Sequence, residues 1–186
     1  MCVMKLFFQI VFKIFIILTI LAGCVTTEEI KETDSDELLN QGIALFKEGQ
    51  YDRAIIYFNK TIEKNPRYAN AYSNRGVAYG NKGQYDKAIS DYNKALEINP
   101  RLGRAYVDRG SAYFFKRNYD KAISDYNKAI EINPRLARAY VGRGIAYFFK
   151  KEYEKVWDDF NKAQNLGYKV NPETLKALRQ ASGRQK

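Results

Sequence analysis

The chain has 186 residues, a formal net charge of +10, no histidine and two cysteines. Without histidine, neither a Ser-His-Asp triad nor a metal site with imidazole ligands can form. No glycine-rich phosphate loop occurs, and the carboxylates stand beside lysines at predicted helix surfaces. The sequence therefore predicts no catalytic residue, no metal site and no cofactor.

Residues 1–23 have the features of a secretory signal peptide. They contain no acid, and Lys5 and Lys13 precede an apolar run at residues 14–21. A basic start, a short apolar run and small residues before a cleavage point are typical of such signals. The run ends in Leu-Ala-Gly-Cys, which resembles the lipobox of bacterial lipoproteins. This resemblance implies that Cys24 receives a diacylglyceryl group and that the chain is cleaved before it.

An uncleaved transmembrane anchor is the alternative to a lipoprotein signal. Residues 6–22 are interrupted by Gln9 and Lys13, and they fall short of the roughly 20 apolar residues that a membrane span prefers. Cleavage would remove Cys2 and lipidation would consume Cys24, which leaves no free thiol or disulfide.

An acylated Cys24 implies a protein anchored to a membrane of the bacterial cell envelope, because two or more acyl chains hold a protein stably. Val25 follows the cysteine in place of an aspartate. If the bacterium has an outer membrane, this resembles lipoproteins sorted to it, with the domain on the periplasmic face.

Residues 24–34 are predicted to form an acidic tether. Six acids lie between Glu28 and Glu37 against the single Lys31, and no apolar pattern follows Ile30. At a maximum of about 3.3–3.6 Å per residue, such a segment reaches roughly 35 Å.

From residue 35 onward the sequence repeats with a period of 34 residues. The second unit contains two amphipathic patterns, which predict helices at Asn70–Lys82 and Tyr85–Asn99, because apolar residues recur at i, i+3 or i+4, and i+7. A fixed period of this length indicates a stacked array in which no unit buries its apolar face alone. The residues that keep the period are Gly42, Gly76, Gly110 and Gly144, then Tyr51, Tyr85, Tyr119 and Tyr153, then Pro66, Pro100 and Pro134.

This pattern resembles the tetratricopeptide repeat. The resemblance implies an all-α fold, a right-handed solenoid of about four helix-turn-helix repeats whose concave face grips peptides or proteins. The repeats are placed at residues 35–68, 69–102, 103–136 and 137–170. The fourth is degenerate, because Val156 replaces an alanine and Tyr168 a proline. In the second repeat the motif consists of Tyr72, Gly76, Tyr79, Ala88, Tyr92, Ala95 and Pro100.

Two further patterns in the repeats concern helix packing, and a third concerns their origin. A glycine in mid-helix costs about 1 kcal/mol relative to alanine, so the glycine column indicates a close approach of two helices. Arginine precedes the glycine in three repeats, and aspartate recurs in their second helices. We interpret these as Arg–carboxylate pairs between the two helices, with ligand-gripping arginines as the alternative. Residues 85–102 and 119–136 differ at one position only, which indicates duplication.

Residues 171–186 are predicted to form a capping helix and a tail. Asn171, Pro172 and Glu173 supply an N-cap, a first-turn proline and a first-turn acid. A weak apolar stripe follows, so we expect this helix to cover the open face of the fourth repeat.

By the geometry of the resembled family, the first helix of each repeat lines the partner-binding groove. Phe-Phe-Lys occurs twice, at residues 114–116 and 148–150. Adjacent residues of a helix point about 100° apart, so both phenylalanines of a pair can scarcely pack into the same helix–helix interface. We expect Phe114 and Phe148 to face the groove, with burial of both rings of each pair as the alternative. The predicted groove residues are Asn40, Ile43, Lys47, Asn74, Val77, Arg104, Val107, Phe114, Arg138, Val141 and Phe148.

The charge of the repeat region has several interpretations. From Leu38 onward there are 28 Lys and Arg against 15 Asp and Glu. This excess of positive charge is consistent with a solvated surface that keeps the protein soluble, or with attraction to an acidic partner, to anionic lipid or to nucleic acid. Export and the use of the tyrosines in packing argue against nucleic acid. The sequence thus predicts a membrane-anchored scaffold for a protein or peptide that carries acidic and apolar residues. The alternative is a structural or envelope-stress lipoprotein that contacts anionic lipid or itself.

Overall fold

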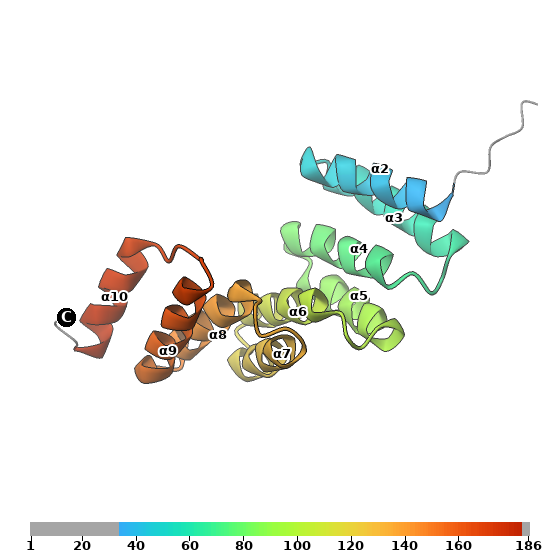
Figure 1. Ribbon diagram of the computed structural model, residues 1–186. Helices are drawn as coiled ribbons and strands as arrows, with labels where there is room; N and C mark the ends of the chain where they lie inside the picture. Colours follow the sequence, from blue (N-terminus) through green and yellow to red (C-terminus); the bar gives the residue numbers. More distant parts are fainter. Residues whose placement is uncertain (1–33, 184–186) are drawn as a thin grey trace, which may run out of the picture. The chain divides into compact units, whose positions relative to one another are not determined.

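The computed structural model describes residues 34–183, and within this range it contains nine α-helices and no strand (Figure 1). The two helices predicted in the second repeat correspond to α4 and α5 within one residue at each end. The predicted signal peptide and Cys24 lie outside the described residues. The helices are α2 (Ser35–Lys47), α3 (Tyr51–Lys64), α4 (Ala69–Asn81), α5 (Tyr85–Ile98), α6 (Gly103–Phe115), α7 (Tyr119–Ile132), α8 (Ala137–Phe149), α9 (Tyr153–Asn165) and α10 (Pro172–Ser182).

None of the helices between residues 34 and 183 combines the length and the apolar character that crossing a membrane requires.

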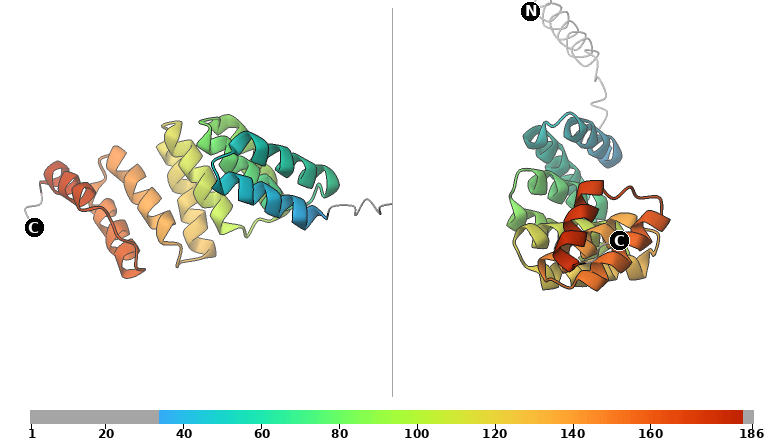
Figure 2. Two further views of the ribbon diagram at one scale, coloured as in Figure 1. Left: turned by 90° about the horizontal axis from the view of Figure 1, so that it is seen from above. Right: turned by 90° about the vertical axis from the view of Figure 1, so that its left-hand side faces the viewer.

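The helices form a succession of packed pairs. Each helix contacts the next along the chain, and the first helices also contact one another, α2 with α4, α4 with α6 and α6 with α8. Figures 1 and 2 show these pairs following one another, with α10 beside α9 at the end of the array. This arrangement confirms the predicted helix-turn-helix solenoid with a short C-terminal helix.

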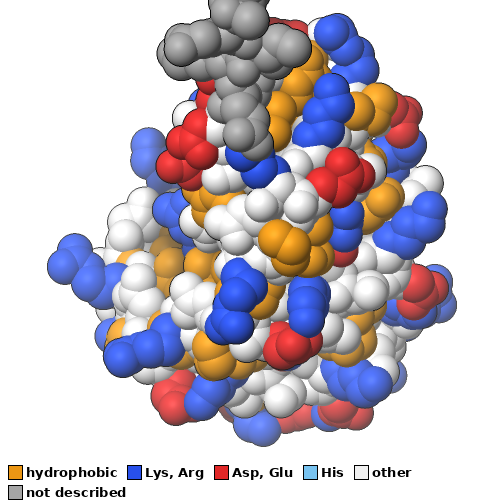
Figure 3. All heavy atoms as spheres, turned by 90° about the vertical axis from the view of Figure 1, so that its right-hand side faces the viewer, with side chains coloured by type: hydrophobic (Ala, Val, Ile, Leu, Met, Phe, Trp, Pro, Cys, Tyr) orange, Lys and Arg blue, Asp and Glu red, His pale blue; other side chains and the backbone are white. Residues whose placement is uncertain are grey.

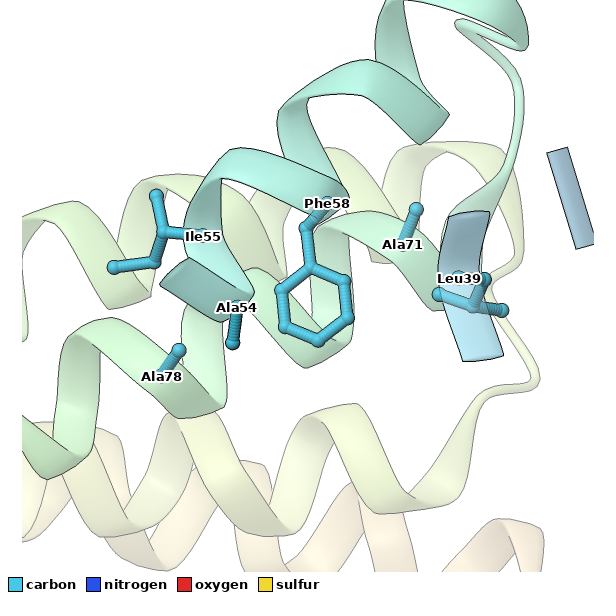
Figure 4. Close-up of a cluster of buried hydrophobic side chains, with 6 residues drawn as sticks. All are labelled: Leu39, Ala54, Ile55, Phe58, Ala71 and Ala78. Atoms are coloured by element: carbon cyan, nitrogen blue, oxygen red, sulfur yellow. The ribbon is translucent and has the colours of Figure 1, made fainter. Parts of the chain in front are cut away.

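The core of the described residues is divided into four clusters. Three of them join neighbouring repeats, and the fourth joins the last repeat to α10. In the first cluster, Leu39 comes from α2, Ala54, Ile55 and Phe58 come from α3, and Ala71 and Ala78 come from α4 (Figure 4). The cluster thus binds the second repeat to the first, as expected of units that cannot bury their apolar faces alone.

The glycine column marks the closest helix approach in each repeat. A Cβ atom built on Gly76 would stand 2.8 Å from the Tyr92 ring, and one on Gly110 would stand 2.9 Å from the Tyr126 ring. Ala122, beside the Gly110 crossing, is fully buried. These contacts confirm that packing, and not flexibility, accounts for the glycines.

An arginine joins three helices at each junction between successive repeats. Arg109 donates from Nε and Nη2 to the Asp125 carboxylate at 2.8 and 2.7 Å, and from Nη1 to Asn93 Oδ1 at 2.6 Å. The Arg–carboxylate pair within the repeat confirms the structural interpretation of these residues. The asparagine on the preceding repeat was not predicted.

We call this arrangement the Arg–Asp–Asn brace. It occurs three times, and in each the hydrogen bond to aspartate raises the pKa of the guanidinium, which keeps the cation charged. The three braces are Arg75 with Asp91 and Asn59, Arg109 with Asp125 and Asn93, and Arg143 with Asp159 and Asn127.

The C-terminal helix begins as predicted. The Asn171 side chain accepts a hydrogen bond from the backbone N–H of Glu173 at 2.8 Å, and Pro172 stands in the first turn. Leu178 is fully buried against Val156 and Phe160 of α9. The helix therefore covers the end of the fourth repeat.

The brace generates a stability prediction. Arg109→Met should lower the free energy of unfolding by about 3 kcal/mol, because it leaves the buried Asp125 carboxylate without its partner. Thermal and urea unfolding followed by circular dichroism would measure the change. Arg101→Met, at an exposed turn position, is the matched control and should have little effect. Equal melting temperatures for the two variants would contradict the structural role of the brace.

Candidate functional site

Three adjoining cavities run along the first helices of the repeats, and together we call them the groove. The largest measures about 730 Å³, and its apolar lining residues include Ile43, Val77 and Val107. The second and third measure about 280 and 200 Å³. Arg138 lines all three cavities, so they adjoin at this side chain.

Most of the predicted groove residues line these cavities. Asn40 and Lys47 are exposed on α2 and line none of the three, and Phe148 lines a separate cavity near α10. The residues that the structure brings together in the groove are Ile43, Asn74, Val77, Arg104, Val107, Phe114, Arg138 and Val141.

The inter-repeat turns and the second helices also contribute lining residues, which reasoning on the first helices alone missed. Leu102, Arg135 and Leu136 come from the turns, and Tyr92 and Tyr126 come from the second helices. The signal for the tyrosines was present in the glycine column, because a glycine on the first helix lets a ring from the second reach through. No such spacing signal marks the turn residues.

Cations predominate among the charged residues of the groove. Three arginines line it, Arg104, Arg135 and Arg138, against the single acid Asp108. Asp108 Oδ1 lies 3.7 Å from Arg138 Nη2, and the Arg138 side chain is 74% exposed. Burial raises the pKa of Asp108 despite the nearby arginines. The loosely paired Arg138 is therefore available to an anionic ligand.

The two tyrosines provide buried hydroxyl groups beside the arginines. The Tyr126 hydroxyl lies 3.2 Å from Ser111 Oγ, and burial raises the Tyr126 pKa to about 12. Burial raises the pKa of Tyr92 as well. The second repeat has no serine equivalent to Ser111, because Val77 occupies that position. Both hydroxyls thus remain protonated at neutral pH and can donate hydrogen bonds.

The two Phe-Phe pairs lie at different cavities. Phe114, as expected, and also Phe115 line the groove, whereas Phe148 and Phe149 line the cavity near α10. The more exposed member of each is the second, with Phe115 60% and Phe149 54% exposed. Phe115 stacks on Tyr85 of the preceding repeat, with ring centroids 5.2 Å apart and an interplanar angle of 8°. Phe114 lines the groove but is half-buried, and it packs against Tyr119 and the cluster around Val107. In each pair, the preceding repeat supplies a tyrosine on which the second ring stacks.

In the part of the chain that the structure describes, no group of three or more acidic or cysteine side chains is arranged to hold a metal ion.

The Phe pairs generate a prediction that separates packing from binding. Phe114→Ala should lower the melting temperature clearly, because truncating a packed ring costs up to about 3–5 kcal/mol. Phe115→Ala should change it little, since its ring is mostly exposed. Circular dichroism melts of the two single variants test this. A larger loss from Phe115→Ala than from Phe114→Ala would show that the rings are assigned the wrong way round.

Comparison with protein families supports the repeat assignment. The tetratricopeptide repeat matches residues 69–102 and 103–136, and a second description, TPR repeat, matches residues 42–83. Together these matches span residues 42–136, just over half of the chain. No match was found among the curated proteins.

Several solved structures are similar to this chain. A crystal structure of MamA is 28% identical with a TM-score of 0.68, over 80% of this chain and 84% of that one. The first TPR of Spaghetti (RPAP3), bound to the HSP90 peptide SRMEEVD, is 29% identical with a TM-score of 0.60, over 61% and 90%. The Arabidopsis OM64 TPR domain is 26% identical with a TM-score of 0.61, over 62% and 95%.

Proposed function

The chain belongs to the tetratricopeptide repeat family, and on that premise we propose that its groove binds an extended segment of another protein while Cys24 holds the chain at a bacterial membrane. The fold is that of a scaffold for protein–protein interaction, and proteins of this family are generally non-catalytic. The chain would accordingly act as an envelope adaptor.

The observation that supports a peptide ligand is the chemistry of the groove. Its lining combines apolar side chains, among them Ile43, Val77 and Val107, with three arginines and a single acid. A segment with both acidic and apolar side chains would satisfy these groups, because apolar burial adds affinity and charge complementarity adds specificity. The HSP90 peptide in the similar RPAP3 structure combines acidic and apolar residues in the same way.

A basic surface that contacts anionic lipid is the competing function. On the face drawn in Figure 3, Lys and Arg side chains are scattered among acidic and apolar ones and do not gather into one patch. Many surface lysines are also paired with acids, as Lys116 is with Asp86 and Lys150 with Asp120. The face drawn and these ion pairs give no support to a lipid-binding patch, which favours the groove as the binding surface.

The groove arginines generate a binding prediction. Arg104→Glu combined with Arg138→Glu should reduce capture of an envelope partner at least thirtyfold, since hot-spot side chains are worth about 2 kcal/mol or more. Pull-down from a detergent extract with the full chain, followed by titration of the captured protein, measures the loss.

The control reverses two exposed charges outside the groove, Arg101→Glu with Arg117→Glu, and should retain capture. If both double variants capture the partner equally, the groove is not the binding surface. Retention of lipid vesicles alone, with no saturable protein partner, would favour the lipid-contacting alternative.

The proposed anchor generates a second prediction. Cys24→Ser should block acylation and processing together, because the lipid is added to the thiol. Mass spectrometry of the wild-type protein should find an acylated Cys24 at the N-terminus. An unmodified chain from Met1 to Lys186 in the membrane fraction would refute the lipoprotein assignment.

A further inference from the structure

A separate cavity of about 460 Å³ lies between α8, α9 and α10, and we call it the terminal pocket. Six of its lining side chains are apolar, namely Ile145, Phe148, Phe149, Phe160, Ala177 and Leu178. Its size falls within the range of pockets that bind ligands, about 300–1,000 Å³.

Helix α10 packs against the fourth repeat through its leucines. Leu178 is buried and Leu175 half-buried against the fourth repeat, whereas Ala177 is exposed and presents only a methyl group. Ala177 stands 34 residues after Arg143, at the position where a brace arginine would reach Asn161. The alanine side chain carries no group that could make such a bond.

The terminal pocket adjoins the groove at one residue. Ile145 lines both the terminal pocket and the smallest cavity of the groove, in which Phe114, Phe115 and Arg138 also lie. The chemistry of the lining changes along this path. The three arginines, on α6, on α8 and in the turn before α8, line the groove, whereas the side chains of α8 and α9 that line the terminal pocket are apolar. Only Glu173 and Thr174 contribute polar side chains to the terminal pocket.

We propose that α10 forms one wall of the ligand site and that the terminal pocket takes a bulky apolar side chain of the bound segment, of the size of leucine, methionine or phenylalanine. The acidic residues of the same segment lie at Arg104 and Arg138. The segment therefore carries its acids and its apolar anchor in separate blocks. This inference rests on the proposed function.

The test fills the pocket from the α10 side. Ala177→Trp adds a large ring to an exposed position that lines the pocket, and Ala181→Trp makes the same change one turn later, at an exposed position outside it. The probes are fluorescein-labelled synthetic peptides with two glutamates at one end and leucine at the other. They are made with spacers of several lengths and in both chain directions, and they are titrated against the full chain in detergent.

We expect at least one peptide to bind the wild type, and Ala177→Trp to weaken it about tenfold or more, because a buried leucine contributes roughly that much to binding. Replacing the peptide leucine by alanine should give the same loss, and Ala181→Trp should give none. Melting temperatures of the two tryptophan variants should match the wild type.

Cross-linking to the wild-type chain tests the inference without relying on the folding of the tryptophan variants. Benzophenone-alanine in place of the peptide leucine should cross-link to residues 173–178 or to α8, located by mass spectrometry. If peptides bind and depend on Arg138 but neither on Ala177 nor on their own leucine, the inference about α10 is wrong and the proposed function stands. If no peptide binds the wild type, or if reversing Arg104 and Arg138 has no effect on binding, both are overturned.

Discussion

The Arg–Asp–Asn brace is the interaction on which the rest of the array depends. A single guanidinium makes a bidentate contact with an aspartate of its own repeat and a third hydrogen bond with an asparagine of the preceding one. The planar fork of arginine suits this geometry, which lysine could not reproduce. Because each brace binds three helices at once, it sets both the angle within a repeat and the step to the next.

The brace also determines which side of the first helices remains for a ligand. Arg109 and Gly110 turn toward the second helices, one to bind Asp125 and the other to admit the Tyr126 ring. The helix face that carries Arg104, Val107 and Asp108 is then left to line the groove. Residues that line the groove and residues that pack against the second helix thus lie on different faces of the same helix. A substitution on one face need not disturb the other.

The fold could be predicted from the sequence because its determinants are periodic. Helix bounds, the close approach at the glycines and the N-cap at Asn171 each follow from local patterns, and the structure agrees with them. The site was less predictable. The more exposed ring of each Phe-Phe pair stacks on a tyrosine of the preceding repeat, which no local pattern indicates. Asn40 and Lys47 belong to the first repeat and line none of the groove's cavities, although the residues 34 positions later, Asn74 and Asn81, do.

The spacing of the brace has a consequence for how the chain can grow. Every brace takes its asparagine 16 residues before the arginine and its aspartate 16 residues after it. One unit of 34 residues therefore carries one arginine, one aspartate and one asparagine, and an in-frame copy inserts between its neighbours without leaving a buried charge unmatched. The near-identity of residues 85–102 and 119–136 is the mark that such a copying event leaves. Gene duplication can thus lengthen this protein one repeat at a time while each intermediate still folds.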